Sequence, residues 1–258
     1  MKLTFLGTGT SVGVPMIGCE CGICRSDNPR NKRLRTSALV QEDGFTILID
    51  ASPDLRSQSL RAGLKKIDAV LFTHSHSDHL LGIDDLRRFN WIQQKRLPAY
   101  GPPDTLKRIR TLFSYAIEKN HTSQIYTQLD LHEIREPFRL GPFEIAPFSL
   151  PHGGMETYGY VIGCNGAKPA LAYFTDCKDV PASARAAIRG IPVLVLDALR
   201  FTNHPTHLTI AESTAIAREA RAGRTYFIHL THDIDHDIHG KDLPEGVAFA
   251  YDELVIEI

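Results

Sequence analysis

The sequence has no excess of charge of either sign. It contains 29 Lys and Arg residues and 30 Asp and Glu residues among 258, which leaves a formal net charge of −1 at pH 7. A protein that binds nucleic acid without sequence preference needs surplus cations to neutralise the phosphates. The balance excludes a histone-like protein or a basic tail, and nucleic acid is not the favoured partner.

Long hydrophobic runs are also missing. The apolar start at residues 1–6 is too short for a signal peptide, and no stretch approaches the roughly eighteen apolar residues of a membrane span. We therefore expect a cytoplasmic protein with no membrane partner. Repeats and low-complexity tracts are absent as well, and a hydrophobic fraction of 43% predicts an ordinary globular fold.

Short apolar runs alternate with helical patterns along the chain, which is typical of an α/β protein. The predicted strands cover residues 2–6, 37–41, 46–50, 69–72, 143–146, 158–162, 170–174, 193–196, 226–229 and 254–257. The predicted helices cover 53–61, 80–93, 103–118, 181–189 and 210–221, the last opening with a capping box from Thr209 to Glu212. Residues 120–136 fit neither pattern, so we expect one domain over 1–258 with an insertion or lid there. Two sheets flanked by helices would bury these strands, and a single large mixed sheet is the alternative.

Three histidines crowd into the segment His74-Ser75-His76-Ser77-Asp78-His79, directly after a buried strand. In an extended loop His74 and His76 project to the same side, and Asp78 can cap a following helix that turns His79 back toward them. Imidazoles this close repel one another below neutral pH unless a metal keeps them deprotonated. Nitrogen and carboxylate donors together favour zinc, manganese or iron over calcium. The alternative is a polar helix start without a metal.

Residues 73–79 resemble the His-x-His-x-Asp-His signature of the metallo-β-lactamase superfamily, and further matches follow in chain order. The resemblance implies a four-layer αβ/βα sandwich with two metal ions at one edge between the sheets. It assigns one ion to His74, His76 and His152, the second to Asp78, His79 and His229, and a bridging role to Asp176. Asp78 is counted among the catalytic residues as well. Asp50 resembles an early structural Asp that braces the loop without touching metal.

A second motif, His207-Leu208-Thr209-Ile210-Ala211-Glu212, is similar to the His-x-Thr-x-x-Glu element of the phosphodiesterase branch, which includes ribonuclease Z and cyclic-phosphate phosphodiesterases. The resemblance implies hydrolysis of a small cyclic phosphate or nucleotide-like diester by a hydroxide that two divalent ions, zinc or manganese, activate. His207 would protonate the departing alkoxide as general acid. His204 is an alternative for that task, and a structural histidine at a helix start is the alternative role for His207.

Three of the five cysteines lie in Cys19-Glu20-Cys21-Gly22-Ile23-Cys24. An odd number of cysteines in a chain without an export signal suits a metal site better than a disulfide framework. A structural zinc needs four ligands. The chain resembles most closely the cyclic-phosphate phosphodiesterases of bacterial phosphonate breakdown, and this resemblance assigns His232 as the fourth ligand of one structural zinc. Free thiols or a redox pair are the alternatives.

Two other functions stay open at this point. One is a thioester or lactone hydrolase of the same superfamily, and the other is a nonenzymatic zinc- or RNA-binding module built on the cysteine cluster. The sequence contains no extended Gly- and Lys-rich insertion of the kind with which ribonuclease Z grips transfer RNA. A small phosphodiester is therefore the expected substrate, and the family resemblance predicts a homodimer.

Overall fold

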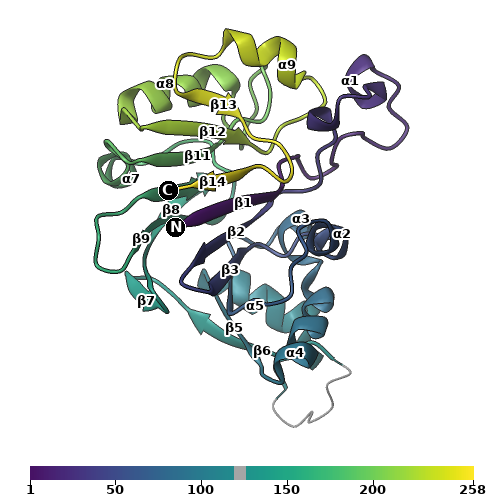
Figure 1. Ribbon diagram of the computed structural model, residues 1–258, viewed down its shortest axis with the longest axis vertical. Coiled ribbons are helices and arrows are strands. Elements are labelled where there is room, and N and C mark those ends of the chain that lie inside the picture. The colour runs from purple at the N-terminus through teal and green to yellow at the C-terminus, as the bar shows by residue number, and fades with distance from the viewer. Residues whose placement is uncertain (119–125) are drawn as a thin grey trace.

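Two mixed sheets, each with seven strands in the described part of the chain, lie face to face in the computed structural model (Figure 1). The structure describes residues 1–118 and 126–258. Helices cover the outer face of each sheet, so the chain forms four layers in the order helices, sheet, sheet, helices. This confirms the predicted αβ/βα sandwich and excludes a single large sheet.

The first sheet has the strand order β14-β1-β2-β3-β4-β5-β6. Its strands are β1 Lys2–Gly7, β2 Ser37–Glu42, β3 Phe45–Ile49, β4 Ala69–Leu71, β5 Leu97–Gly101, β6 Leu129–Glu133 and β14 Val255–Glu257. The second sheet has the order β13-β12-β11-β10-β9-β8-β7. Its strands are β7 Phe138–Leu140, β8 Phe143–His152, β9 Met155–Cys164, β10 Leu171–Phe174, β11 Val193–Asp197, β12 Arg224–Ile228 and β13 Val247–Phe249.

The described helices are mostly short. They are α1 Gly22–Arg25, α2 Leu55–Arg61, α3 Ser77–Leu80, α4 Arg87–Gln93, α5 Pro103–Leu112, α6 Ser114–Ile117, α7 Ala182–Ala187, α8 Ile210–Ala220 and α9 His236–His239, with 3-10 turns η1 Pro29–Asn31, η2 Ile83–Leu86 and η3 Gly240–Asp242. Both hydrogen bonds of the predicted capping box at Thr209 are present in α8. None of the described helices is long and apolar enough to cross a membrane.

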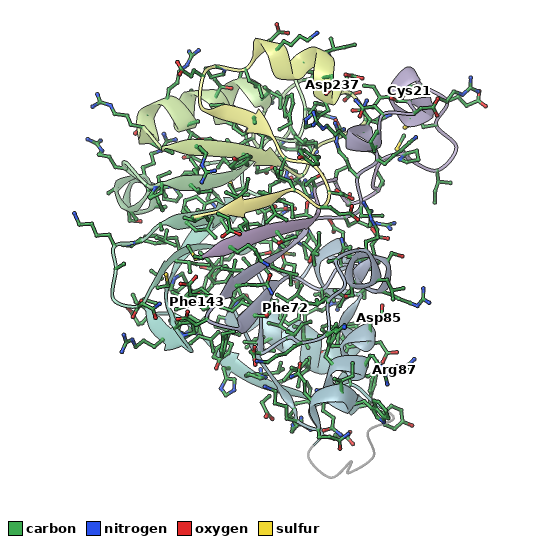
Figure 2. All side chains as sticks on the ribbon, in the orientation of Figure 1. Cys21, Phe72, Asp85, Arg87, Phe143 and Asp237 are labelled. Atoms are coloured by element: carbon green, nitrogen blue, oxygen red, sulfur yellow. The ribbon has the colours of Figure 1, made fainter. Side chains whose placement is uncertain are left out.

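The core consists of three apolar layers. Phe143, the first residue of β8, packs between the two sheets, whereas Phe72, directly after β4, packs between the first sheet and its helices (Figure 2). Leu194 of β11 and Ile216 of α8 both belong to the third layer, between the second sheet and its helices. The three layers hold both sheets at a fixed separation, which positions the loops at their edge.

The structure contains all ten predicted strands and four that the sequence patterns missed, namely β5, β6, β7 and β13. β5 includes Pro98, which argues against a strand by propensity, and β7 and β13 have only three residues each. The predicted insertion at 120–136 is wrong in part, because Leu129–Glu133 is the edge strand β6 and pairs with β5. Residues 120–125 of that range lie outside the described residues.

The helix predicted over 80–93 is interrupted after α3. A Cβ atom on Gly82 would lie 1.9 Å from the carbonyl oxygen of Ser52, and the Gly82 N–H donates to the carbonyl of Ala51 over 2.9 Å. This close approach ties the segment to the loop after β3, so the chain continues as η2 and α4. The helix predicted over 103–118 likewise divides into α5 and α6 at Phe113, whose φ of −125° is not helical.

Truncating a buried aromatic side chain between the sheets should destabilise the whole fold. Phe143 is completely buried, and Phe143→Ala should lower the free energy of unfolding by about 3 to 5 kcal/mol because it leaves a cavity. Phe201→Ala is the matched control, since that side chain is 48% exposed. Denaturant unfolding would measure both, and an equal effect of the two substitutions would contradict the assigned core.

Candidate active site and metal centres

The predicted metal ligands of the active site lie at the carboxyl ends of strands from both sheets. His74 follows β4 in the first sheet, while His152 is the last residue of β8, and Asp176 and His229 follow β10 and β12 in the second. Asp78 and His79 lie in α3, which begins at Ser77. The prediction that Asp78 caps a helix starting near residue 80 is wrong, because His76 occupies the N-cap. The early helix start turns Asp78 and His79 toward the strand ends.

Three imidazoles and one carboxylate form the first metal pocket. His76 Nδ1 lies 3.0 Å from His74 Nε2 and 3.2 Å from His152 Nε2. The Oδ2 atom of Asp176 lies 3.7 Å from His74 Nε2. All four donor atoms lie within 4.8 Å of one another, so they could bind one ion together.

The second metal pocket shares Asp176 with the first. His79 Nε2 lies 3.3 Å from Asp78 and 3.4 Å from Asp176. His229 Nε2 lies 3.5 Å from Asp78 and 3.3 Å from Asp176. A single Oδ2 atom of Asp176 therefore faces both groups of histidines, which would allow this carboxylate to bridge two ions.

Hydrogen bonds outside the pockets set the tautomers of two ligands. Asp50 Oδ2 lies 2.7 Å from Nδ1 of His79, and the Asp50 carboxylate also accepts from the N–H and hydroxyl of Thr73. The carbonyl of Thr206 lies 2.9 Å from Nδ1 of His152 and can only accept. Each Nδ1 atom therefore donates its proton outward, and the Nε2 lone pair is directed into the pocket.

The donor set fits two divalent transition-metal ions. Nε2 of His79 and both ring nitrogens of His229 are buried without a hydrogen bond to the described residues, which is costly unless another group binds them. Burial would lower the pKa of His79, but the carboxylates of Asp176, Asp78 and Asp50 raise it well above the usual value. Three buried carboxylates thus create a site that demands positive charge.

The backbone is strained at three positions around these pockets. Asp50, Asp176 and His229 have φ values of 60°, 51° and 60°, in the left-handed region. Residues other than glycine adopt this region at a cost of about 1 to 3 kcal/mol each. Each of the three directly follows or nearly follows a buried strand, so the sheets hold the strained residues in place.

His207 lies beside the metal ligands and is paired with a buried carboxylate. Its ring stacks on His229 at a centroid distance of 4.8 Å and lies 4.7 Å from His152. Its Nδ1 atom lies 2.8 Å from Oδ2 of Asp197, which is fully buried. Burial would lower the pKa of His207, but Asp197 outweighs it and raises the pKa above the usual value. This arrangement favours a protonated imidazole whose Nε2 is free to donate.

Asp197 is a site residue that the sequence patterns did not identify. It ends β11, where its Oδ2 also accepts the N–H of Cys177 over 2.9 Å. The available signal was a single carboxylate at the end of an apolar strand, which is not specific by itself. His204, the alternative general acid, is only half-buried, and its ring lies 5.0 Å from that of His207.

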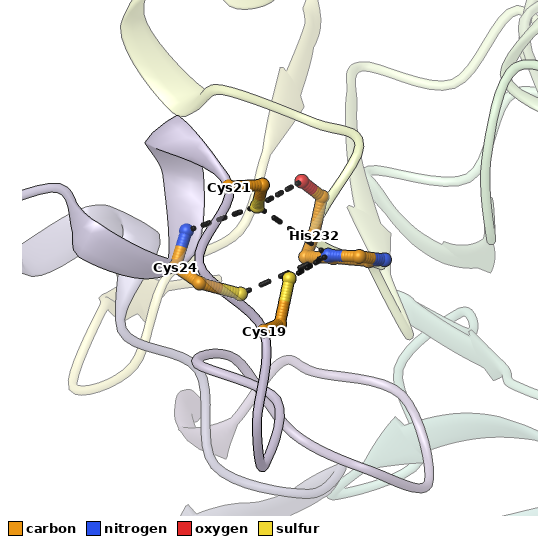
Figure 3. Close-up of side chains that lie close together, drawn as sticks. All are labelled: Cys19, Cys21, Cys24 and His232. Atoms are coloured by element: carbon orange, nitrogen blue, oxygen red, sulfur yellow. Dashed lines mark hydrogen bonds between the residues drawn. The ribbon is translucent and has the colours of Figure 1, made fainter.

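The three cysteines and His232 form a separate pocket (Figure 3). The Sγ atoms of Cys19, Cys21 and Cys24 lie 3.3, 3.5 and 3.7 Å from Nδ1 of His232. The N–H of Cys24 donates to Cys21 Sγ and lowers the pKa of that thiol to about 6. Burial raises the pKa of Cys24 to about 11. We call these four residues the thiolate pocket; four soft donors around one point are the ligand set of a structural zinc.

Comparisons with known proteins show the family to which the chain belongs. A family model described as "Beta-lactamase superfamily domain" matches residues 46–230. A crystal structure of a diphosphatase from the PhnP family superposes with a TM-score of 0.91 at 41% identity, over 100% of this chain and 97% of that one. Ribonuclease Z of Bradyrhizobium sp. (strain ORS 278) is 23% identical over 89% of each chain.

A curated relative with a different name also matches most of the chain. Octanoyltransferase of Porphyromonas gingivalis is 37% identical over 98% of this chain, but the chain spans only 51% of that protein's length. The fold and the site define a protein of the metallo-β-lactamase type whose buried donors fit a two-metal centre. The chain belongs to the β-lactamase superfamily, in the phosphodiesterase branch that holds the PhnP family and ribonuclease Z.

Replacing the shared carboxylate should empty both pockets of the active site. Asp176→Asn removes the negative charge that faces His74, His79 and His229, and the purified protein should lose active-site metal and activity together. Elemental analysis beside an activity assay would measure this. Asp84→Asn, at a partly exposed carboxylate on η2, is the control, and a metal-replete, fully active Asp176→Asn protein would exclude the bridging role.

Replacing the partner of His207 should slow the reaction without removing metal. Asp197→Asn keeps the shape but removes the charge that favours the imidazolium, so kcat should fall by about 10² to 10⁴. Metal content should stay that of the unmodified protein. Asp179→Asn, at an exposed carboxylate, should change neither quantity. Loss of metal in Asp197→Asn would mean that Asp197 serves the metal centre and not the proton donor.

Proposed function

We propose that the protein hydrolyses a small phosphodiester, a cyclic phosphate or a nucleotide-like diester, with two zinc or manganese ions in its active site. One observation carries the proposal: a carboxylate-held imidazole lies beside the two-metal pockets. The rings of His207 and His229 are stacked 4.8 Å apart, and Asp197 holds the far nitrogen of His207. This combines metal ligation with a proton donor at the same point.

The chain supplies the proton that the leaving group needs. When bound, the two ions would provide a hydroxide at neutral pH and neutralise charge on the phosphoryl oxygens. His207 donates from Nε2 because Asp197 occupies Nδ1 and favours the charged ring. An alkoxide is a poor leaving group, so protonation during bond cleavage is the larger part of what His207 contributes.

The proton donor also bears on the alternative functions. A thiolate leaves readily without a proton, so a thioester hydrolase gains little from the Asp197–His207 pair. A lactone does release an alkoxide, but the relatives in the same branch are named as a diphosphatase and ribonucleases Z, and these names favour phosphorus esters. A zinc- or RNA-binding module would have no use for two pockets of buried, inward-facing donors.

The metal of the thiolate pocket and the size of the substrate are also part of the proposal. We propose zinc for the thiolate pocket, because three sulfurs and one imidazole nitrogen are the donors of closed structural zinc sites. The substrate is small in this proposal because the sequence lacks the long Gly- and Lys-rich insertion that grips transfer RNA. The homodimer stays a prediction.

Leaving-group dependence tests the proposed reaction. His207→Ala should reduce kcat by about 10² to 10⁴ on a dialkyl phosphodiester, and much less on bis(p-nitrophenyl) phosphate, whose leaving group departs without a proton. His204→Ala is the matched control and should leave the ratio of the two rates unchanged. Metal content, measured in parallel, should be the same in all three proteins.

Two results would count against the proposal. An unchanged rate of His207→Ala on the dialkyl substrate would exclude His207 as general acid. Faster turnover of a thioester or lactone panel than of every phosphodiester tested would instead favour the alternative hydrolase. Because the first result concerns one residue and the second the substrate class, the two failures can be told apart.

A further inference from the structure

One short loop carries a ligand of each kind of metal pocket. His229 is the last ligand of the two-metal centre along the chain. His232, three residues later, belongs to the thiolate pocket. The loop leaves the second sheet after β12 and continues to α9. Any shift of this loop therefore moves a ligand in both sites at once, so the contacts that hold it are decisive for both.

Arg33 holds this loop from within the protein. Its side chain is 1% exposed and is among the largest fully buried side chains of the described residues. Its Nη1 donates to the carbonyl of Thr231 over 3.0 Å, and its Nη2 donates to the carbonyl of Ile234 over 2.8 Å. These two carbonyls flank His232. The rigid, planar fork of one guanidinium thus fixes the backbone on both sides of the zinc ligand.

The backbone of Arg33 also reaches the cysteine loop. Arg33 and Val14 exchange two backbone hydrogen bonds of 2.7 and 2.9 Å. Two residues after Val14, the N–H of Met16 donates to Sγ of Cys24 over 3.4 Å. Figure 2 shows Cys21 and Asp237 at the same end of the molecule. Arg33 therefore lies between the two segments that form the thiolate pocket.

Burial of this cation is not explained by a direct ion pair. No described carboxylate approaches the Arg33 guanidinium within 4.0 Å in an ion pair, and its Nε has no hydrogen-bond partner among the described residues. Burial lowers the pKa of Arg33 to about 10, although Asp252 and Asp235 oppose this from a distance. The side chain is still charged at neutral pH, and a buried charge is tolerated only where it is well bound. Its bonds go to the two loop carbonyls and to Oδ1 of Asn31, the last over 3.2 Å.

A second set of contacts holds the other end of the loop. The N–H of Leu230 donates to the carbonyl of Thr8 over 3.0 Å, and the N–H of Thr10 donates back to Leu230 over 3.3 Å. Thr8 in turn donates its N–H and hydroxyl to the buried carboxylate of Asp252. His229 lies directly before this anchor, so the loop is fixed at Leu230 and at 231–234. The segment that joins the two metal ligands is thus held at both of its ends.

We propose that Arg33 is a positioning residue that holds, through the backbone of residues 231–234, one ligand of each metal site, and that the thiolate pocket and the two-metal centre therefore bind their ions interdependently. Such coupling is reciprocal, because occupancy of either site raises the affinity of the other by the same factor. The inference rests on metal binding at both sites and not on the identity of the substrate.

The test is the metal affinity of each site in full-length Arg33 variants. Arg33→Met removes both bonds to the loop, and Arg33→Lys keeps the charge but not the two-pronged geometry. Mn²⁺ competition with a chromophoric chelator reports on the two-metal centre, and the sulfur-to-cobalt absorption of bound Co²⁺ reports on the thiolate pocket. Arg33→Met should weaken both affinities by about 10- to 100-fold, and Arg33→Lys should weaken both to a smaller extent.

Arg30→Met is the matched control. Arg30 contacts Asp237 of the neighbouring segment over 3.5 Å, but its side chain is exposed and makes no described bond to residues 229–234. Both affinities should stay within twofold of the unmodified protein. If Arg33→Met also leaves both affinities within twofold, or weakens only one of them, the proposed positioning role is wrong.

A second measurement keeps the proposal testable if the Arg33 variants do not fold. His232→Ala removes a ligand of the thiolate pocket at a partly exposed side chain, and the proposal requires a lower Mn²⁺ affinity at the two-metal centre of this variant. An unchanged Mn²⁺ affinity would overturn the coupling. Failure of the proposed phosphodiesterase activity would leave all of these affinities measurable, so the two hypotheses can fail separately.

Discussion

The carboxylate of Asp176 is the contact on which the rest of the site depends. Its Oδ2 atom lies 3.3 to 3.7 Å from ring nitrogens of His74, His79 and His229. A buried carboxylate needs positive charge and hydrogen bonds close by. Histidines from both sheets, together with the ions that they can bind, provide that charge. The strand ends and loops at one edge of both sheets therefore have to meet at this point, and the active site is also a structural constraint on the fold.

Rigid strands make this convergence possible. Asp50, Asp176 and His229 all adopt left-handed backbone conformations just after buried strands. An isolated loop would relax such strain, but here each strained residue is attached to a sheet whose two faces are packed. The same stiffness extends outward to His207, whose ring is held between Asp197 and the metal ligands. Ligand geometry and proton donation are thus set by the same sheets.

Contiguous patterns in the sequence predicted the site better than isolated residues did. The segment from His74 to His79 is informative by itself because its spacing places several donors on one side. His152 and His229 are single residues in ordinary surroundings, and only their order in a family resemblance singled them out. Asp197 and Arg33 carried no local signal, since an acid at a strand end and an arginine in a polar loop are common. Their roles come from burial and from partners 10 and 198 residues away.

Residue types and short spacings were enough to predict the alternation of strands and helices, the donors for transition metals and the capping box of α8. Each of these features depends on residues that are close together in the sequence. Contacts between distant segments required the folded chain. The cysteine loop meets His232 across 213 residues, Gly82 interrupts a helix because the loop after β3 approaches it, and 129–133 becomes an edge strand only beside β5. Local patterns contain no information on such distances, since packing of the two sheets brings these residues together.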